Sequence, residues 1–248
     1  MIRREIEAWI HRKLLSIGWR VTRVGPLANG WEHGRAYWDS SYIRRLKFNP
    51  ATIIDVGVAR GTPQLYDAFP DAYLLLIEPL AEFSTDISRI LTRRRGVYVP
   101  VAAGRHAADL ELWVDASDPL QTSFYRRHPL ETTEGALETR RVPVKTLDEI
   151  VAGHPCPRPF GLKIDVEGAE LEVLQGAPAV LAETQFLIAE VNVIDRFKGA
   201  YKFAELVEWV DAAGFCACDI LDIGRSTASA VTFFDLVFRK KEHLCASS

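Results

Sequence analysis

The residues with the clearest chemical potential lie where an apolar run meets a glycine-containing loop. Residues 52–56 read Thr-Ile-Ile-Asp-Val, and Gly57 and Gly61 follow them. Glycines let a ligand approach the backbone, and the N–H groups that open the next helix point toward any negative group. Thr62 suits the cap of that helix and Pro63 its first position. The segment predicts a strand, a ligand-binding loop and a helix in succession.

An acidic residue ends the next apolar run. Glu78 directly follows residues 73–77. A carboxylate at this point accepts hydrogen bonds from both ribose hydroxyls of a nucleoside. It implies a free 2′-hydroxyl, because a 2′-phosphate would be repelled.

The glycine spacing distinguishes between nucleoside cofactors. A dinucleotide site usually shows Gly-x-Gly-x-x-Gly, because its backbone packs against a pyrophosphate. Here three residues separate Gly57 from Gly61, and the charged Arg60 stands where a small residue is expected. Asp55, at the strand end, suits a cofactor with a positive amino group. The pattern favours S-adenosylmethionine, which carries an ammonium, a carboxylate and a ribose but no phosphate. The alternatives are an NAD-dependent Rossmann oxidoreductase and a non-catalytic cofactor-binding protein.

A second motif occupies residues 161–171, Gly-Leu-Lys-Ile-Asp-Val-Glu-Gly-Ala-Glu-Leu. Strand alternation places Lys163, Asp165 and Glu167 on one side if the extended geometry persists. Open α/β sheets bind ligands at the carboxyl ends of their strands, which favours a site role for Asp165. The alternative is that Asp165 or Glu167 caps the following helix and that Lys163 pairs with one of them.

The surrounding pattern predicts the elements that position these residues. Strands that are apolar throughout and alternate with helices indicate a parallel sheet covered on both faces, so we expect a Rossmann-like, doubly wound α/β fold. Residues 105–146 break the rhythm with two alternating, half-exposed strands at 110–114 and 141–144 around a polar loop. The other expected strands are 52–56, 73–77, 97–102, 160–166, 186–191 and 233–238, and the expected helices are 62–69, 80–93 and 201–213.

From about residue 50 to 240 the sequence resembles the FkbM methyltransferases. The matching motifs are Asp55-Val56-Gly57 with Gly61, Ile77-Glu78-Pro79, residues 144–148 (Val-Lys-Thr-Leu-Asp) and residues 162–170. The resemblance implies a class I methyltransferase with a seven-stranded sheet, its last strand antiparallel, which methylates hydroxyl groups. It also implies that Asp55, Gly57 and Gly61 shape the methionine side of the pocket, that Glu78 holds the ribose, and that Asp165 lies beside the methyl group.

One residue departs from the pattern of this family. Members commonly read Asp-Val-Gly-Ala-Asn-x-Gly, whereas Ala59 takes the asparagine position here. We hypothesise that Arg60 compensates by pairing with the cofactor carboxylate. Adenine is expected in an apolar slot near Val101, Ala102 and Ala103.

An alcohol acceptor needs a base for its proton. The candidates are Asp165, Glu190, Lys163 and His128. Glu190 and Asn192 could instead bind a divalent cation together with Asp165, although we favour a site without metal and leave the metal unknown. Histidines such as His128 and His154 are more often surface or packing residues than bases, and we assign neither a catalytic role.

Two loops are candidates for contact with the acceptor. The loop of Thr122, Ser123 and Phe124 closes over the adenine edge or the acceptor, or is an ordinary surface loop. A set of basic residues suits an anionic or sugar-phosphate acceptor, or forms a solvated face: Arg126, Arg127, Arg196 and Lys198. A sugar, a glycan or a small natural product is the expected acceptor class.

Composition limits the remaining possibilities. The net charge of −3 gives no overall attraction to nucleic acid, and four cysteines form neither a zinc site nor a disulfide framework. With no transmembrane or signal segment, a reducing, cytoplasmic setting is expected. We expect a helical extension over 1–50, a catalytic domain over 51–241 and a tail over 242–248. The basic, amphipathic residues 1–20 predict a helix packed on the domain edge, or else a lid, a homodimer contact or a membrane-surface anchor.

Overall fold

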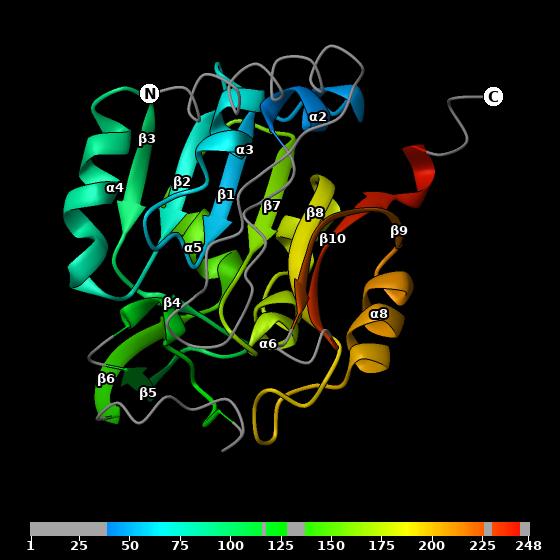
Figure 1. Cartoon of the computed structure of the whole chain (residues 1–248). Helices are drawn as coiled ribbons and strands as arrows, with labels where there is room; N and C mark the ends of the chain where they lie inside the picture. The colour runs from blue at the N-terminus through cyan, green and yellow to red at the C-terminus, as the bar shows by residue number, and fades with distance from the viewer. Residues whose placement is uncertain (1–38, 116–117, 128–136, 226–229, 244–248) are drawn as a thin grey trace, which may run out of the picture.

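A seven-stranded sheet forms the centre of this computed structural model, which describes residues 39–115, 118–127, 137–225 and 230–243 (Figure 1). Neighbouring strands pair in parallel from β3 to β8, whereas β10 is antiparallel to both of its neighbours. This confirms the expected mostly parallel sheet with an antiparallel last strand. In sheet order the strands are β3 (Gly96–Val99), β2 (Tyr73–Ile77), β1 (Thr52–Val56), β7 (Phe160–Ile164), β8 (Thr184–Asn192), β10 (Val231–Lys240) and β9 (Phe215–Arg225).

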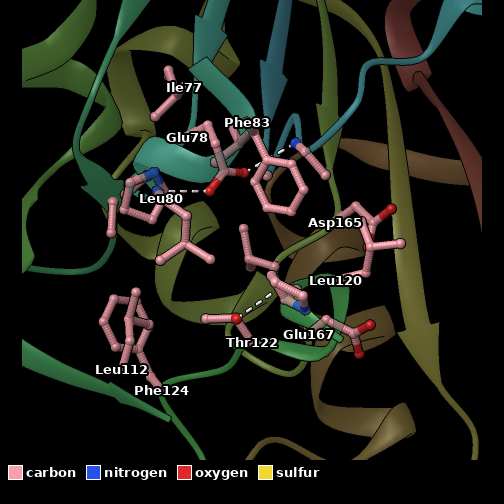
Figure 2. Close-up of a pocket in the computed structure, with 18 of the residues that line it drawn as sticks. Ile77, Glu78, Leu80, Phe83, Leu112, Leu120, Thr122, Phe124, Asp165 and Glu167 are labelled. Atoms are coloured by element: carbon pink, nitrogen blue, oxygen red, sulfur yellow. Dashed lines mark hydrogen bonds between the residues drawn. The ribbon is translucent and has the colours of Figure 1, made fainter. Parts of the chain in front are cut away.

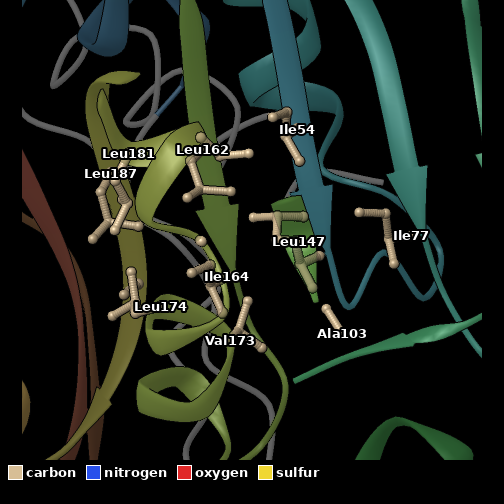
Figure 3. Packing of buried hydrophobic residues seen from close by; sticks show 14 of the residues in the cluster. Ile54, Ile77, Ala103, Leu147, Leu162, Ile164, Val173, Leu174, Leu181 and Leu187 are labelled. Carbon is tan, nitrogen blue, oxygen red and sulfur yellow. The ribbon is translucent and has the colours of Figure 1, made fainter. Parts of the chain in front are cut away.

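Helices cover both faces of the sheet. Every residue of β1 is buried, because Ile53 packs with the helices of one face and Ile54 with those of the other. Figure 3 shows the second of these layers, where Leu147, Val173 and Leu181 pack toward strand residues such as Leu162. One face carries α2 (Ser40–Arg45), α3 (Pro63–Ala68) and α4 (Ser84–Leu91), with η1 (Ala81–Phe83) before α4; the other carries α5 (Leu147–Gly153), α6 (Glu170–Gln175), α7 (Pro178–Ala182) and α8 (Phe203–Ala212).

A small three-stranded sheet lies beyond the carboxyl ends of the parallel strands (Figure 1). Its order is β4 (Ala102–Ala103), β6 (Leu137–Lys145) and β5 (Ala108–Asp115), and η2 (Pro119–Gln121) follows β5. The strands predicted at 110–114 and 141–144 lie within β5 and β6. We call residues 104–145, which run from the end of β4 to the end of β6, the insertion.

Two details of the strands differ from the sequence-based expectation. The apolar run 97–102 divides into β3 and β4, because Pro100 cannot donate a ladder hydrogen bond. The edge strand β9 was not predicted, since polar residues interrupt its apolar ones and much of it is exposed.

Several predictions fall on residues that the structure does not describe. The helix expected over 1–20 and most of the 1–50 extension lie outside the described residues, as does the end of the tail, 244–248. The described tail residues include η4 (Lys241–His243). Within the described ranges, no helix has both the length and the apolar character needed to span a bilayer.

Candidate functional site

A cavity of about 610 Å³ opens where the carboxyl ends of β1, β2 and β7 face the insertion (Figure 2). Its volume lies in the range of about 300–1,000 Å³ that is usual for small-molecule sites. The lining residues come from the glycine loop, the ends of β2 and β4, the insertion and the loop after β7. They are Val56, Gly57, Ala59, Ile77, Glu78, Pro79, Leu80, Phe83, Val101, Ala102, Ala103, Leu112, Asp118, Pro119, Leu120, Thr122, Phe124, Asp165, Val166, Glu167 and Glu190.

The glycine loop is pressed against the end of β7. Gly57 has φ +79°, and a Cβ there would lie 1.8 Å from the Asp165 carbonyl oxygen, so this position requires glycine. Gly57 and Ala59 line the cavity, whereas Gly61 lies outside its lining. Arg60 is exposed and also outside the lining. The structure therefore gives no support to a contact between Arg60 and a ligand in this cavity.

Asp55 lies beneath the loop rather than in the cavity. Its side chain is fully buried and accepts hydrogen bonds from Thr62 Oγ1 (3.0 Å) and Tyr66 OH (2.5 Å). Burial raises the pKa of Asp55, and the nearby Lys163 ammonium opposes this effect. Thr62 and Pro63 occupy the predicted cap and first helical positions of α3, but the Thr62 hydroxyl bonds Asp55 instead of capping the helix. Asp55 thus fixes the loop from below.

Glu78 faces the cavity at the end of β2, as predicted. It is 5% exposed and accepts hydrogen bonds from the backbone N–H groups of Ala59 (3.0 Å) and Leu80 (2.9 Å). Burial raises the pKa of Glu78 to about 7, although these two hydrogen bonds favour its ionised form. One carboxylate therefore ties the glycine loop to the segment that follows β2.

The cavity has an apolar part beside Glu78. Val101, Ala102 and Ala103 line it from β4 and the residue before, as expected for the predicted slot. The insertion adds Leu112 and Phe124, which Figure 2 shows on the opposite side of the cavity from Asp165 and Glu167. A flat, apolar ring can be enclosed between these walls.

Lys163 lies on β7 and Asp165 comes directly after this strand, but only Asp165 lines the cavity. Lys163 Nζ lies 3.0 Å from Asp165 Oδ2 and 3.8 Å from Asp55 Oδ1. Burial disfavours the charge of Lys163, but the two carboxylates outweigh it and raise the pKa above its usual value. Lys163 therefore keeps its proton and acts as a hydrogen-bond donor, not as a base.

Glu190 also lines the cavity, at the end of β8. Arg196 Nη1 lies 2.5 Å from Glu190 Oε1, and Arg196 Nη2 lies 3.1 Å from Glu167 Oε2. Burial raises the pKa of Glu190 well above its usual value, and the Arg196 charge opposes the rise. Asn192 is buried, accepts a hydrogen bond from Arg196 and lies outside the lining.

The four basic residues expected to face an acceptor lie elsewhere, as none of them lines this cavity. Arg127 Nη2 is 2.9 Å from Glu167 Oε2, so Arg127 and Arg196 both neutralise Glu167. Arg126 stacks 4.5 Å from the Trp113 ring. The Lys198 backbone N–H donates to the Arg126 carbonyl at 2.9 Å. The contact of Lys198 with Arg126 joins the insertion to the loop after β8, and the pair of Arg127 with Glu167 joins it to the loop after β7.

The loop of residues 122–124 faces the cavity and is not an ordinary surface loop. Thr122 and Phe124 line the cavity, and Ser123 is 2% exposed. The Ser123 hydroxyl donates to the Glu167 carbonyl oxygen at 2.5 Å and accepts from the Tyr125 N–H at 2.9 Å. It therefore joins the insertion to the loop after β7.

Sequence reasoning missed Glu170, which shapes that loop. Its fully buried carboxylate accepts hydrogen bonds from the N–H groups of Val166 and Gly168, both at 3.1 Å, and from Tyr201 OH at 2.8 Å. A glutamate in the first turn of a helix is usually explained by its favourable interaction with the helix dipole. The only sequence signal for a role in the site was therefore its position in the 162–170 motif.

The other candidate residues are not brought together with the site. The His154 ring bonds the Ile150 carbonyl within its own helix end, and His128 lies outside the described residues. Among the residues that the structure describes, no group of three or more His, Cys, Asp or Glu side chains is arranged to hold a metal ion.

The family model described as "Methyltransferase FkbM domain" matches residues 55–216. Hexuronic acid methyltransferase AglP from Haloferax volcanii is 28% identical over 123 residues, which are 49% of this chain and 48% of that protein. This match thus spans about half the length of the relative.

Solved structures give similar matches. Methyltransferase FkbM from Methylobacillus flagellatus KT has a TM-score of 0.48 and 14% identity, with 82% of this chain and 48% of that chain covered. The 1,6-didemethyltoxoflavin-N1-methyltransferase from Burkholderia thailandensis, solved with 1,6-didemethyltoxoflavin and S-adenosylhomocysteine, has a TM-score of 0.40 and 14% identity, with 81% and 76% covered.

Proposed function

The chain belongs to the FkbM methyltransferase family, and on this premise we propose that it transfers the methyl group of S-adenosylmethionine to a hydroxyl oxygen of a sugar, a glycan or a small natural product. The relative named a hexuronic acid methyltransferase supports a sugar-derived acceptor. A methyltransferase with an alcohol acceptor must bind a sulfonium cofactor, hold the hydroxyl near it and remove one proton.

The charge of the cavity carries the cofactor assignment. Glu78, Asp118, Asp165, Glu167 and Glu190 line it, and no described lysine or arginine does. An acidic lining attracts the sulfonium and ammonium groups of S-adenosylmethionine and repels the pyrophosphate of NAD. This observation favours the methyl donor over the oxidoreductase cofactor.

Each part of the cofactor has a matching part of the cavity. Glu78 would accept hydrogen bonds from the ribose hydroxyls, and Ala102 with its apolar neighbours would enclose the adenine. Gly57 allows the methionine part to approach the loop backbone. Asp55 and Gly61 act from outside the lining by fixing the shape of that loop.

Bound S-adenosylmethionine supplies an electrophilic methyl group on a positively charged sulfur. Transfer would form the bond between the acceptor oxygen and the methyl carbon and break the carbon–sulfur bond, whose electron pair would remain on the sulfur of a neutral thioether. The hydroxyl proton passes to a carboxylate. We assign this role to Glu190, because it lines the cavity next to the strand that leads to Asp165 and the Arg196 guanidinium holds one of its oxygens, which favours the ionised carboxylate.

Asp165 and Lys163 position the reactants beside that base. Asp165 lines the same side of the cavity, and the protonated Lys163 fixes its carboxylate at 3.0 Å. Collinear alignment of acceptor oxygen, carbon and sulfur is a large part of the acceleration available to such a displacement.

Thermal unfolding with added ligand tests the cofactor assignment. S-adenosylhomocysteine should raise the midpoint of the native protein, NAD should not, and Glu78→Ala should reduce the rise. Glu82→Ala is the matched control, since Glu82 pairs with exposed Arg140 and lies outside the lining. A rise with NAD alone would overturn the proposal, and no rise with either ligand would favour a non-catalytic protein.

A further inference from the structure

Two cavity carboxylates are held by one guanidinium. Arg196 donates through Nη1 to Glu190 Oε1 and through Nη2 to Glu167 Oε2. Both nitrogens belong to the same planar group, so the two carboxylates are fixed next to each other. Glu167 has a further anchor in Arg127 Nη2, at 2.9 Å from the same oxygen Oε2.

The other oxygen of each carboxylate is available to a ligand. Neither Glu167 Oε1 nor Glu190 Oε2 has a hydrogen-bond partner among the described residues, and neither is a sealed, buried atom. Both residues line the cavity, although Glu190 is only 9% exposed and the Glu167 side chain only 18%. Each of the two carboxylates therefore keeps one oxygen without a partner among the described residues, in a cavity that Asp165 also lines.

The arginines explain why these carboxylates can bind hydroxyls. Arg127 and Arg196 pair with these carboxylates but do not line the cavity. They therefore offset the negative charge without presenting a cation to the acceptor. A neutral hydroxyl donates well to such a carboxylate, because hydrogen bonds to charged groups are the stronger ones. A carboxylate or phosphate on the acceptor would face these carboxylate oxygens and would meet no cation among the described lining residues.

We propose that the acceptor is a vicinal diol of a neutral sugar, unlike the acidic sugar in the name of the relative, and that Glu167 binds the hydroxyl next to the one that is methylated. Glu190 takes the reacting hydroxyl, and Glu167 sets which diol can place it there. This inference rests on the proposed methyltransferase activity and adds a specificity-determining residue, Glu167, and a substrate class to it.

Binding to the complex with S-adenosylhomocysteine is the first test. The probes are methyl glucopyranoside, methyl mannopyranoside and methyl galactopyranoside, their monodeoxy analogues and methyl glucuronide, measured by saturation-transfer NMR and calorimetry. At least one neutral glycoside should bind, and removal of one of two adjacent hydroxyls should weaken it roughly tenfold or more. Methyl glucuronide should bind more weakly than methyl glucopyranoside.

Variants separate Glu167 from the cofactor site. Glu167→Gln should raise KM for the diol about tenfold and change kcat little, because it loses a charge-assisted hydrogen bond to a group that does not react. Its affinity for S-adenosylhomocysteine should be unchanged. Glu138→Gln is the control, since Glu138 is exposed and pairs with Arg140. Glu167 has φ +55°, a left-handed backbone conformation that asparagine adopts more readily than most residues. Glu167→Asn is therefore a second variant that is compatible with this conformation.

The outcomes distinguish the inference from the function on which it rests. If S-adenosylhomocysteine binds but no glycoside does, or if the deoxy or glucuronide probes bind as well as the diols, the diol assignment is wrong and the methyltransferase remains. If Glu167→Gln weakens the cofactor instead, Glu167 belongs to the cofactor site. If S-adenosylhomocysteine does not bind the native protein, the proposed function itself fails.

Discussion

The carboxylate of Glu78 accepts a hydrogen bond from the backbone N–H of Ala59 at 3.0 Å, and Ala59 has a left-handed φ of +46°. The same bond that shapes the glycine loop thus holds an alanine in a conformation that costs an ordinary residue about 1–2 kcal/mol. Asparagine, the residue that the FkbM pattern has here, tolerates this conformation better.

We therefore expect Ala59→Asn to raise the free energy of unfolding by about 0.5–1 kcal/mol, measured by urea denaturation. Ala152→Asn is the control: Ala152 is exposed in α5, where asparagine should be neutral or slightly destabilising. Equal effects of the two substitutions would show that the backbone of Ala59 is not strained.

The pKa of Glu78 predicts how cofactor affinity depends on pH. The pKa of Glu78 rises from 4.5 to about 7 on folding, so the Glu78 carboxyl group of the folded protein is protonated below about pH 7. Ribose hydroxyls donate to the ionised form, hence the affinity for S-adenosylhomocysteine should fall by up to about tenfold per pH unit below 7 and level off above it. Calorimetry from pH 5.5 to 8.5 measures this, and Glu78→Gln should flatten that part of the profile. An unchanged slope in the variant would assign the dependence to another group.

The same shift has a consequence for stability without ligand. Between pH 4.5 and about 7 the folded protein retains a proton at Glu78 that the unfolded chain releases, so the free energy of unfolding should fall as the pH rises through this window. Glu170, whose pKa burial also raises to about 7, acts in the same direction. Urea denaturation at pH 5 and pH 8 should show a smaller difference for Glu78→Gln than for the native protein. A larger difference in the variant would reverse the sign of the argument.

Glu170 provides a prediction about the loop that carries the reactive residues. Its carboxylate accepts hydrogen bonds from Val166 N–H, Gly168 N–H and Tyr201 OH. The side-chain amide of a glutamine would place its own N–H donors against these donor groups. Glu170→Gln should lower the free energy of unfolding by about 2 kcal/mol, and Tyr201→Phe by about 1 kcal/mol. Chemical denaturation measures both. A neutral Glu170→Gln would mean that the 166–168 loop keeps its form without these bonds.

The elements that could be predicted from sequence are those whose burial is uniform. The strands β1 and β2 have the expected bounds because nearly all of their residues are buried and most of these are apolar. The edge strand β9 carries exposed Cys218 and half-exposed Asp219 and Asp222, so its sequence resembles a polar segment. A strand is visible in the sequence either as a continuous apolar run or as a regular alternation, and β9 shows neither pattern.

The places of the site residues could be predicted where the end of a strand alone positions the side chain. Glu78 and Asp165 need only their positions after β2 and β7, whereas the orientation of a loop arginine depends on which carboxylate it reaches. Arg127 and Arg196 turn onto Glu167, and no spacing in the sequence marks that pairing, since Arg127 comes from the insertion and Arg196 from the loop after β8.

Lys163 and Asp55 give a test of the charges beneath the loop. Lys163→Met leaves the buried Asp55 and the nearby Asp165 without their cation, and should destabilise the protein by about 3 kcal/mol at pH 8. The loss should become smaller as the pH falls, because burial raises the pKa of Asp55 and a proton can then replace the lost charge. Lys145→Met, at an exposed lysine of β6, is the control. In a double-mutant cycle by chemical denaturation, Lys163→Met combined with Asp55→Asn should cost at least about 1 kcal/mol less than the sum of the single changes. Additive losses would show that Lys163 serves Asp165 alone and does not neutralise Asp55.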